Sequence, residues 1–138
     1  MEQSLPRVGA GAVIIKDGKV LLAKRKGAHG AGTWGTMGGH VEFGERPTET
    51  AKREAMEELG ITVGNLHFVS CANMIEEGVH YIDISFTADI ISGTPVIQEP
   101  DRIEAIGWYP LDDLPQPLFQ PVRVVLDVLK TGQYYVEL

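Results

Sequence analysis

The segment from residue 47 to residue 59 constrains the fold most, because it predicts a helix with two different faces. Pro47 suits the first helical position, and Gly60 suits the left-handed residue after the last turn. With a turn of about 100° per residue, Glu57 and Glu58 lie about −60° and 40° from Glu54, so the three carboxylates share one stripe. The adjacent face is apolar and needs a sheet to pack on; it consists of Ala51, Ala55, Met56 and Leu59.

The rest of the chain reads mainly as strands. Residues 8–16 and 19–25 predict an antiparallel pair joined by a turn at Asp17 and Gly18, and residues 66–74 and 79–91 predict a second hairpin around Gly78. Residues 105–109 predict a short strand that Pro110 ends, and residues 121–130 predict a second helix. The glycine-rich residues 26–33 predict a loop. With no internal linker, we expect one domain over residues 1–138.

Composition narrows the partners and the location. The formal net charge of −7 argues against a nucleic-acid partner, because such proteins need basic surface to replace phosphate counterions. We find no apolar run of roughly 18 residues and no signal-peptide pattern, so we expect a cytoplasmic protein without a membrane partner. Cys71 is the only cysteine and is expected to be a small core residue.

The acidic stripe has two interpretations. Like charges three and four residues apart destabilise an isolated helix by a few tenths of a kcal/mol per pair, which a bound divalent cation would offset. Oxygen ligands of this kind suit magnesium or manganese rather than zinc. The alternative is a solvated acidic face in which Arg53 bridges to Glu49 or Glu57.

The spacing around the helix favours the metal site. Gly39 is followed after five residues by Glu45, and after seven more by Arg53 and the three helix carboxylates. This 23-residue segment, residues 39–61, resembles the Nudix box, with Ala55 where the family prefers a bulkier apolar residue. The resemblance extends to Trp108-Tyr-Pro and covers most of the chain. It implies the α+β Nudix fold, a mixed β-sheet sandwiched between helices (α/β/α).

The resemblance also assigns roles within the box. Glu54, Glu57 and Glu58 become the ligands of Mg²⁺, for which Mn²⁺ can substitute, and a main-chain carbonyl near Gly39 adds a ligand. Arg53 orients the carboxylates and Glu45 braces the loop against the helix. Glu54 is the first choice for the general base.

Residues outside the box are expected to complete the site. Relatives often place a further metal ligand or base before the Trp108 strand, where we favour Glu104 over Glu99; ordinary solvated acids are the alternative. Arg25 is expected to bind substrate phosphates. His40 either reaches the leaving phosphate or makes a structural hydrogen bond. The remaining candidates for the substrate pocket, which could equally be structural, are Trp34, Met37, Gly38, Phe43 and Tyr81.

The substrate follows from a closer resemblance. Residues 24–34 and 38–45 are similar to the MutT-type nucleoside triphosphate diphosphatases, and within them to the thiopurine nucleotide diphosphatase subgroup. Met37 departs from the proline that many relatives have there. The resemblance implies hydrolysis of purine nucleoside triphosphates, oxidised or modified ones included, to monophosphate and pyrophosphate by a protein that is commonly a homodimer. The alternatives are a nucleotide sugar, dinucleotide or other diphosphate derivative as substrate, and a non-catalytic nucleotide-sensing module.

Overall fold

A computed structural model describes residues 4–27, 29–76 and 78–138. The elements in chain order are β1 (Arg7–Lys16), β2 (Lys19–Arg25), β3 (Trp34–Gly35), β4 (Met37–His40), α1 (Pro47–Leu59), β5 (Thr62–Glu76), β6 (Val79–Ser92), β7 (Ile103–Pro110), α2 (Gln120–Thr131) and β8 (Tyr135–Glu137).

Both predicted hairpins and both predicted helices are confirmed. Asp17 and Gly18 have positive φ angles of 52° and 75°, as a tight turn between β1 and β2 requires. Helix α1 has the predicted bounds and is followed by Gly60 at a φ of 68°. Strands β3, β4 and β8 were not predicted, and they are only two to four residues long.

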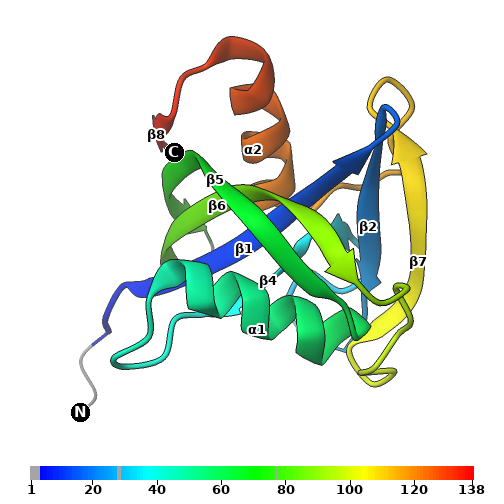
Figure 1. Cartoon of the computed structure of the whole chain (residues 1–138). Coiled ribbons are helices and arrows are strands. Elements are labelled where there is room, and N and C mark those ends of the chain that lie inside the picture. Colours follow the sequence, from blue (N-terminus) through cyan, green and yellow to red (C-terminus); the bar gives the residue numbers. More distant parts are fainter. Residues whose placement is uncertain (1–3, 28, 77) are drawn as a thin grey trace.

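The strands form a mixed sheet around β1. β1 pairs in parallel with β6 and antiparallel with β4, while β5 joins β6 on one side and β8 on the other. The last residues of β1 turn away to pair with β2, which also carries β3 and β7. Strand β1 is therefore the shared element of the whole sheet, as Figure 1 shows.

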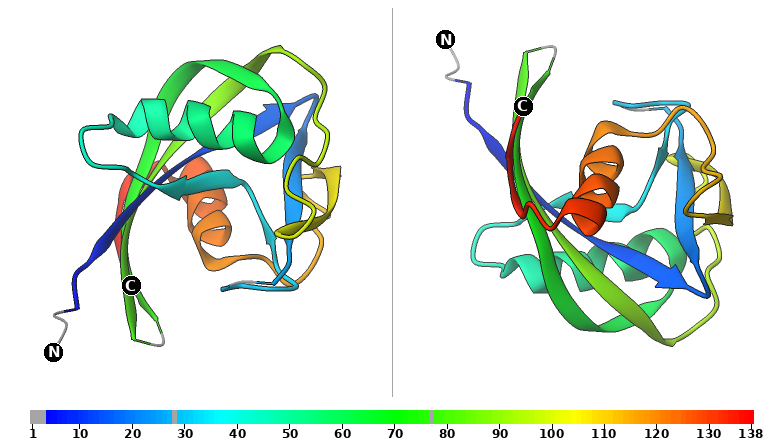
Figure 2. Two further views of the ribbon diagram at one scale, coloured as in Figure 1. Left: turned by 90° about the horizontal axis from the view of Figure 1, so that it is seen from below. Right: turned by 90° about the horizontal axis from the view of Figure 1, so that it is seen from above.

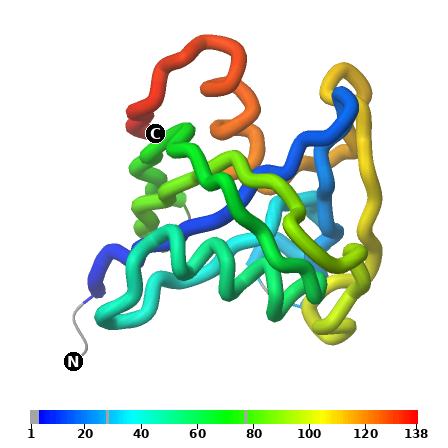
Figure 3. Tube along the Cα trace, in the orientation of Figure 1, coloured from blue at the N-terminus to red at the C-terminus, as the bar shows by residue number. Residues whose placement is uncertain are grey.

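The helices lie on opposite faces of the β4-β1-β6-β5 part of the sheet (Figure 2). The predicted mixed sheet between helices is therefore confirmed. In Figure 3 the chain leaves β4 and turns back into α1, so the edge strand and the helix lie side by side. Within the described residues, neither helix is long and apolar enough to cross a bilayer.

The packing of α1 differs from the prediction at one position. Ala51, Ala55 and Leu59 are fully buried against the sheet, as predicted. Met56 was expected among them, and this is wrong: it lies at the far edge of the apolar arc and is 47% exposed. Thr50, which was not predicted to be buried, is fully buried on another side of the helix, and its hydroxyl donates a hydrogen bond to Glu45.

Two glycines allow β4 to lie unusually close to β1. Gly11 and Gly38 are paired in register. A Cβ atom on Gly11 would collide with the Met37 carbonyl oxygen, and one on Gly38 would lie 3.0 Å from the Ala10 carbonyl oxygen. Any larger residue here would push the edge strand away from β1 and move the start of the Nudix-like segment.

We therefore expect Gly11→Ala to destabilise the protein by about 1–3 kcal/mol, as overpacking does. Urea denaturation would measure this. Gly35→Ala is the matched control, because a Cβ atom on this strand glycine would meet the Phe119 side chain at an ordinary van der Waals distance of 3.6 Å. Equal stabilities of the two variants would contradict the close-approach explanation.

Candidate active site

Arg53 is the centre of the hydrogen-bond network on α1. Its Nε donates to Glu45 Oε2 at 2.8 Å, its Nη1 to Glu54 Oε1 at 2.8 Å, and its Nη2 to the His40 carbonyl at 3.0 Å. Its Nη1 also reaches Glu57 Oε2 at 3.3 Å. The hydrogen bonds to Glu45, ahead of the other causes, raise the pKa of Arg53. One guanidinium thus orients two helix carboxylates and ties the helix to the end of β4.

Glu45 anchors the loop before α1. It accepts hydrogen bonds from Arg53, from the Thr50 hydroxyl at 2.6 Å and from the Glu42 N–H at 3.1 Å. These bonds, led by the one from Arg53, lower the pKa of Glu45 to about 2. Its side chain is 13% exposed and lies behind the helix carboxylates, where it braces the loop.

Glu45→Gln should therefore lower stability in a pH-dependent way. The folded pKa lies below the ordinary value of 4.5, so the contribution is complete above about pH 4.5 and is lost as the pH falls towards 2. We expect the Tm difference between wild type and variant to be largest near pH 7 and to shrink between pH 5 and pH 3. Glu49→Gln, which alters an exposed carboxylate of the same helix, should show no such trend. A pH-independent difference for Glu45→Gln would contradict the assignment.

Acidic side chains form one wall of a cavity of about 720 Å³. Burial, and then the neighbouring Glu54 carboxylate, raise the pKa of Glu58 well above its usual range, although the Gly38 N–H donates to Glu58 Oε1 at 3.1 Å. Burial raises the pKa of Glu99 as well, and the charges of Glu54 and Glu57 add to this. The wall holds more negative charge than its surroundings balance, which a cation would relieve.

The carboxylates do not stand as a closed ligand set. Within the described residues, no three acidic, histidine or cysteine side chains are grouped closely enough to hold a metal ion together. The Glu57 carboxylate is 49% exposed and turned to Arg53, and one oxygen of Glu54 is turned to Arg53 as well. The donor set nevertheless fits magnesium by its chemistry, because it consists of oxygens and leaves room for water and phosphate.

Gly39 leaves room for the Glu54 carboxylate. A Cβ atom on Gly39 would collide with the Glu54 carboxylate. The absence of a side chain lets α1 lie against the edge strand and brings Glu54 up to the β4 backbone. Glycine at this position therefore has a steric reason that does not depend on any ligand.

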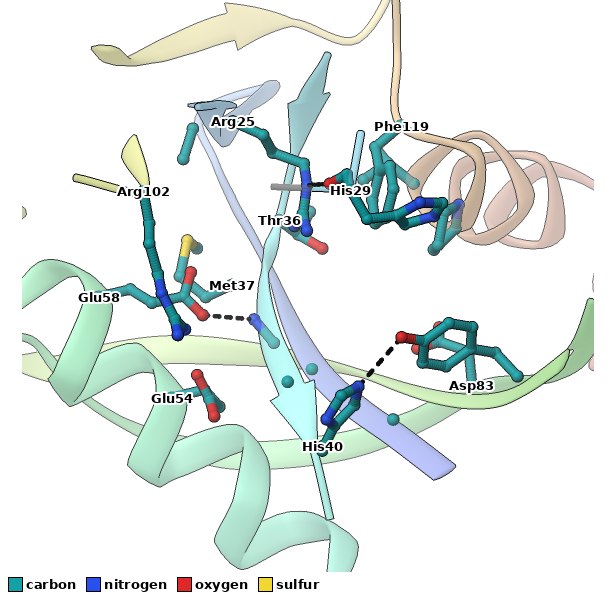
Figure 4. Close-up of a pocket in the computed structure, with 18 of the residues that line it drawn as sticks. Arg25, His29, Thr36, Met37, His40, Glu54, Glu58, Asp83, Arg102 and Phe119 are labelled. Atoms are coloured by element: carbon teal, nitrogen blue, oxygen red, sulfur yellow. Dashed lines mark hydrogen bonds between the residues drawn. The ribbon is translucent and has the colours of Figure 1, made fainter. Parts of the chain in front are cut away.

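The far side of the cavity carries a cation over an aromatic ring. The Arg25 guanidinium lies 4.1 Å from the centre of the Phe119 ring, and its Nε donates to the His29 carbonyl at 3.0 Å. Burial lowers the pKa of Arg25, and the charge of Glu58 partly opposes this. Figure 4 shows Arg25, His29 and Phe119 across the pocket from Glu54 and Glu58.

The sheet supplies the third side of the cavity. His40 Nε2 lies 3.1 Å from the Tyr81 hydroxyl, and the two rings are stacked with centroids 5.7 Å apart. Burial, and then the charge of Arg7, lower the pKa of His40. His40 and Tyr81 therefore form an aromatic edge to the pocket.

Asp83 is a lining residue that the sequence analysis missed. It lies on β6 beside Tyr81 and accepts a hydrogen bond from the Ser85 hydroxyl at 3.1 Å. Burial raises the pKa of Asp83 to about 6, and the bond from Ser85 only partly opposes this. The alternation Tyr81-Ile82-Asp83-Ile84-Ser85 could have revealed it, since it places an acid on the same sheet face as Tyr81.

The structure brings most of the predicted site residues to this cavity. Those that line it are Arg25, Met37, Gly38, Gly39, His40, Arg53, Glu54, Glu57, Glu58 and Tyr81. Glu99 lines it too, whereas Glu104 lies outside on β7 with its carboxylate 3.7 Å from Lys24 Nζ. Trp34 packs edge-on against Tyr109 in the core, and Phe43 is fully exposed on the loop before α1.

Because the pKa of Asp83 is raised, we expect its ionised form to lower the stability of the folded protein. Because the folded pKa is about 6 and the ordinary value is 3.8, burial of the charged form costs stability as the pH rises from about 4 to 6. Asp83→Asn should raise the Tm more at pH 8 than at pH 4. Asp89→Asn, at an exposed position of the same strand, should show no pH-dependent gain. A lower Tm for Asp83→Asn at pH 8 would contradict the prediction.

Comparisons with known proteins agree with this geometry. The NUDIX domain family model matches residues 5–128. A crystal structure of a MutT NUDIX hydrolase from Burkholderia pseudomallei is similar with a TM-score of 0.88 and 43% identity, covering 91% of this chain and 99% of that one. The oxidized purine nucleoside triphosphate hydrolase of Mus musculus is 36% identical over 75% of this chain and 65% of its own length. The ADP-ribose pyrophosphatase of Methanocaldococcus jannaschii is 32% identical over 91% of this chain and 74% of its own length.

Proposed function

This chain belongs to the Nudix family, and from that premise we propose that it is a magnesium-dependent hydrolase of purine nucleoside triphosphates, including oxidised or modified ones. The products of the proposed reaction are the nucleoside monophosphate and pyrophosphate. One observation carries the proposal: a single cavity of about 720 Å³ has the α1 carboxylates on one side and Arg25 on another. A volume of this size suits a small-molecule ligand.

The metal ligands are proposed from the wall of the cavity. Glu54, Glu57 and Glu58 supply carboxylate oxygens, and the β4 backbone at Gly39 supplies a carbonyl. We now favour Glu99 over Glu104 as the additional acid, because Glu99 lines the cavity and Glu104 faces Lys24. When bound, magnesium polarises a phosphoryl oxygen and lowers the pKa of the attacking water.

The side chains of this protein have separate tasks in the reaction. Arg53 orients Glu54 by binding its Oε1, and Glu54 is the proposed acceptor of the proton of the attacking water. Within the described residues, the terminal nitrogens of Arg25 make no hydrogen bond, and they face the cavity where they can bind phosphate oxygens. The acids activate water at one side while Arg25 binds the phosphates opposite.

A diphosphate such as ADP-ribose is the second candidate substrate. The likeness to the ADP-ribose pyrophosphatase of Methanocaldococcus jannaschii over 91% of the chain favours it, and the same acids would serve. The products separate the two candidates. Pyrophosphate release from a nucleoside triphosphate supports the first, whereas two monophosphates from intact ADP-ribose, with nucleoside triphosphates left uncleaved, would reject it.

The mechanism predicts that Glu58→Gln lowers kcat on a cleaved nucleoside triphosphate by at least about 100-fold. The fold should survive, because glutamine removes a charge that Glu54 crowds and keeps an acceptor for the Gly38 N–H. Millimolar magnesium should raise the Tm of the wild type and have less effect on the variant.

Glu49→Gln is the control for this experiment, since it removes a carboxylate of α1 that lies outside the cavity. Its kcat and its response to magnesium should equal those of the wild type. Wild-type turnover by Glu58→Gln would defeat the assignment of the acidic wall.

A further inference from the structure

A hollow runs across three strands beside the acidic wall. Gly9 of β1 is in register with His40 of β4 on one side and with Asp83 of β6 on the other. In the next row, Gly11 lies between Gly38 and Ser85. These rows share the sheet face that Asp83 and Tyr81 occupy, because residues two apart on a strand point the same way. Glycines therefore form the floor of a slot between His40 and Asp83.

Gly9 keeps the Asp83 carboxylate accessible. A Cβ atom on Gly9 would lie 3.2 Å from Asp83 Oδ1 and 3.6 Å from the Gly39 carbonyl oxygen. Any side chain at this position would cover the oxygen that faces the slot. The absence of a side chain on Gly9 and the position of the partly buried Asp83 carboxylate thus both shape the slot.

Asp83 has unused acceptor capacity. An ionised carboxylate can accept about four hydrogen bonds. In the described part of the chain it accepts one, from Ser85, and forms no ion pair with a lysine or arginine. Asp83 is partly buried, and a carboxylate withdrawn from water without a cation is costly unless donors satisfy it. The N–H groups of a ligand could satisfy the acceptor positions that Ser85 leaves open.

The slot lies at a suitable distance from the acidic wall. Asp83 is on β6 and the Nudix segment begins on β4, with β1 between them, so two strand spacings of about 4.8 Å separate them by about 10 Å. In Figure 4, Asp83 lies on the opposite side of the pocket from Glu54 and Glu58. One nucleotide can place its phosphates at the wall and its base in the slot.

We propose that Asp83 determines base specificity by accepting hydrogen bonds from two adjacent N–H groups of a guanine-type base. This inference rests on the proposed function. Guanine presents its N1–H and its 2-amino group side by side, which matches the two oxygens of a carboxylate. On the corresponding edges of adenine and cytosine a donor lies next to an acceptor, and a carboxylate can satisfy only half of this pair.

The test compares kcat/KM for dGTP, dITP and dATP at pH 8 with magnesium. Hypoxanthine in dITP lacks only the 2-amino group, so the wild type should prefer dGTP over dITP by about 10-fold or more. Asp83→Asn offers one acceptor and one donor, as adenine requires, and should lower the dGTP to dATP ratio by at least about 10-fold. Asp89→Asn makes the same chemical change at an exposed position of β6 and should leave the ratio unchanged.

Binding of nucleoside monophosphates tests the role of Asp83 without requiring that the protein cleaves triphosphates. Calorimetry should show that the wild type binds dGMP more tightly than dIMP and that Asp83→Asn loses this difference, whether or not any triphosphate is cleaved. No turnover together with an Asp83-dependent preference for dGMP would reject the proposed function alone. An equal loss for all bases in Asp83→Asn, or no preference for guanine in the wild type, would overturn the role of Asp83.

Discussion

The hydrogen bonds of Arg53 are the interaction on which the rest of the site depends. The helix concentrates acidic side chains on one stripe, which is unfavourable when they have no counter-charge. Arg53 compensates from within the same stripe by contacting Glu54 and Glu57, while Glu45 and the His40 carbonyl fix the guanidinium from the other side. The helix, the preceding loop and the end of β4 are thereby joined through one side chain.

Glycines also shape the site, because they allow the backbone of β4 to lie close to β1 and to Glu54. Gly11 and Gly38 let β4 lie against β1, and Gly39 lets Glu54 reach the β4 backbone. Glu58 then accepts the Gly38 N–H, so the edge strand and the acidic wall are also linked directly. The acidic wall therefore depends as much on missing side chains as on the carboxylates themselves.

Local patterns in the sequence predicted the helices and the long strands, because periodicity and turn residues are short-range signals. The α1 carboxylates were identified in this way, and the structure places them on one cavity. Strands β3, β4 and β8 were missed because they are short, and those in the glycine-rich stretch lack alternation. Glu104 was preferred over Glu99, and Asp83 was missed, because sequence spacing does not show which loop or strand face turns towards the cavity. That depends on the pairing of β1 with β4 and β6, which joins residues that are distant in the sequence, such as Gly11 with Gly38 and Gly9 with Asp83.

The α1 acids lie close together in the sequence, whereas the residues of the slot come from distant strands, so the two sides of the cavity can be altered by separate substitutions. The α1 part of the acidic wall lies in residues 39–61 and is held by contacts within that segment, so substitutions there affect the fold of the segment and its chemistry together. The slot is assembled from Gly9, His40 and Asp83 on three strands, and Asp83 accepts only the Ser85 hydroxyl among the described residues. A change at Asp83 therefore alters what the slot accepts without disturbing Arg53 or the acids that it orients. The strand register thus places the slot apart from the acidic wall, but near enough for one ligand to contact both.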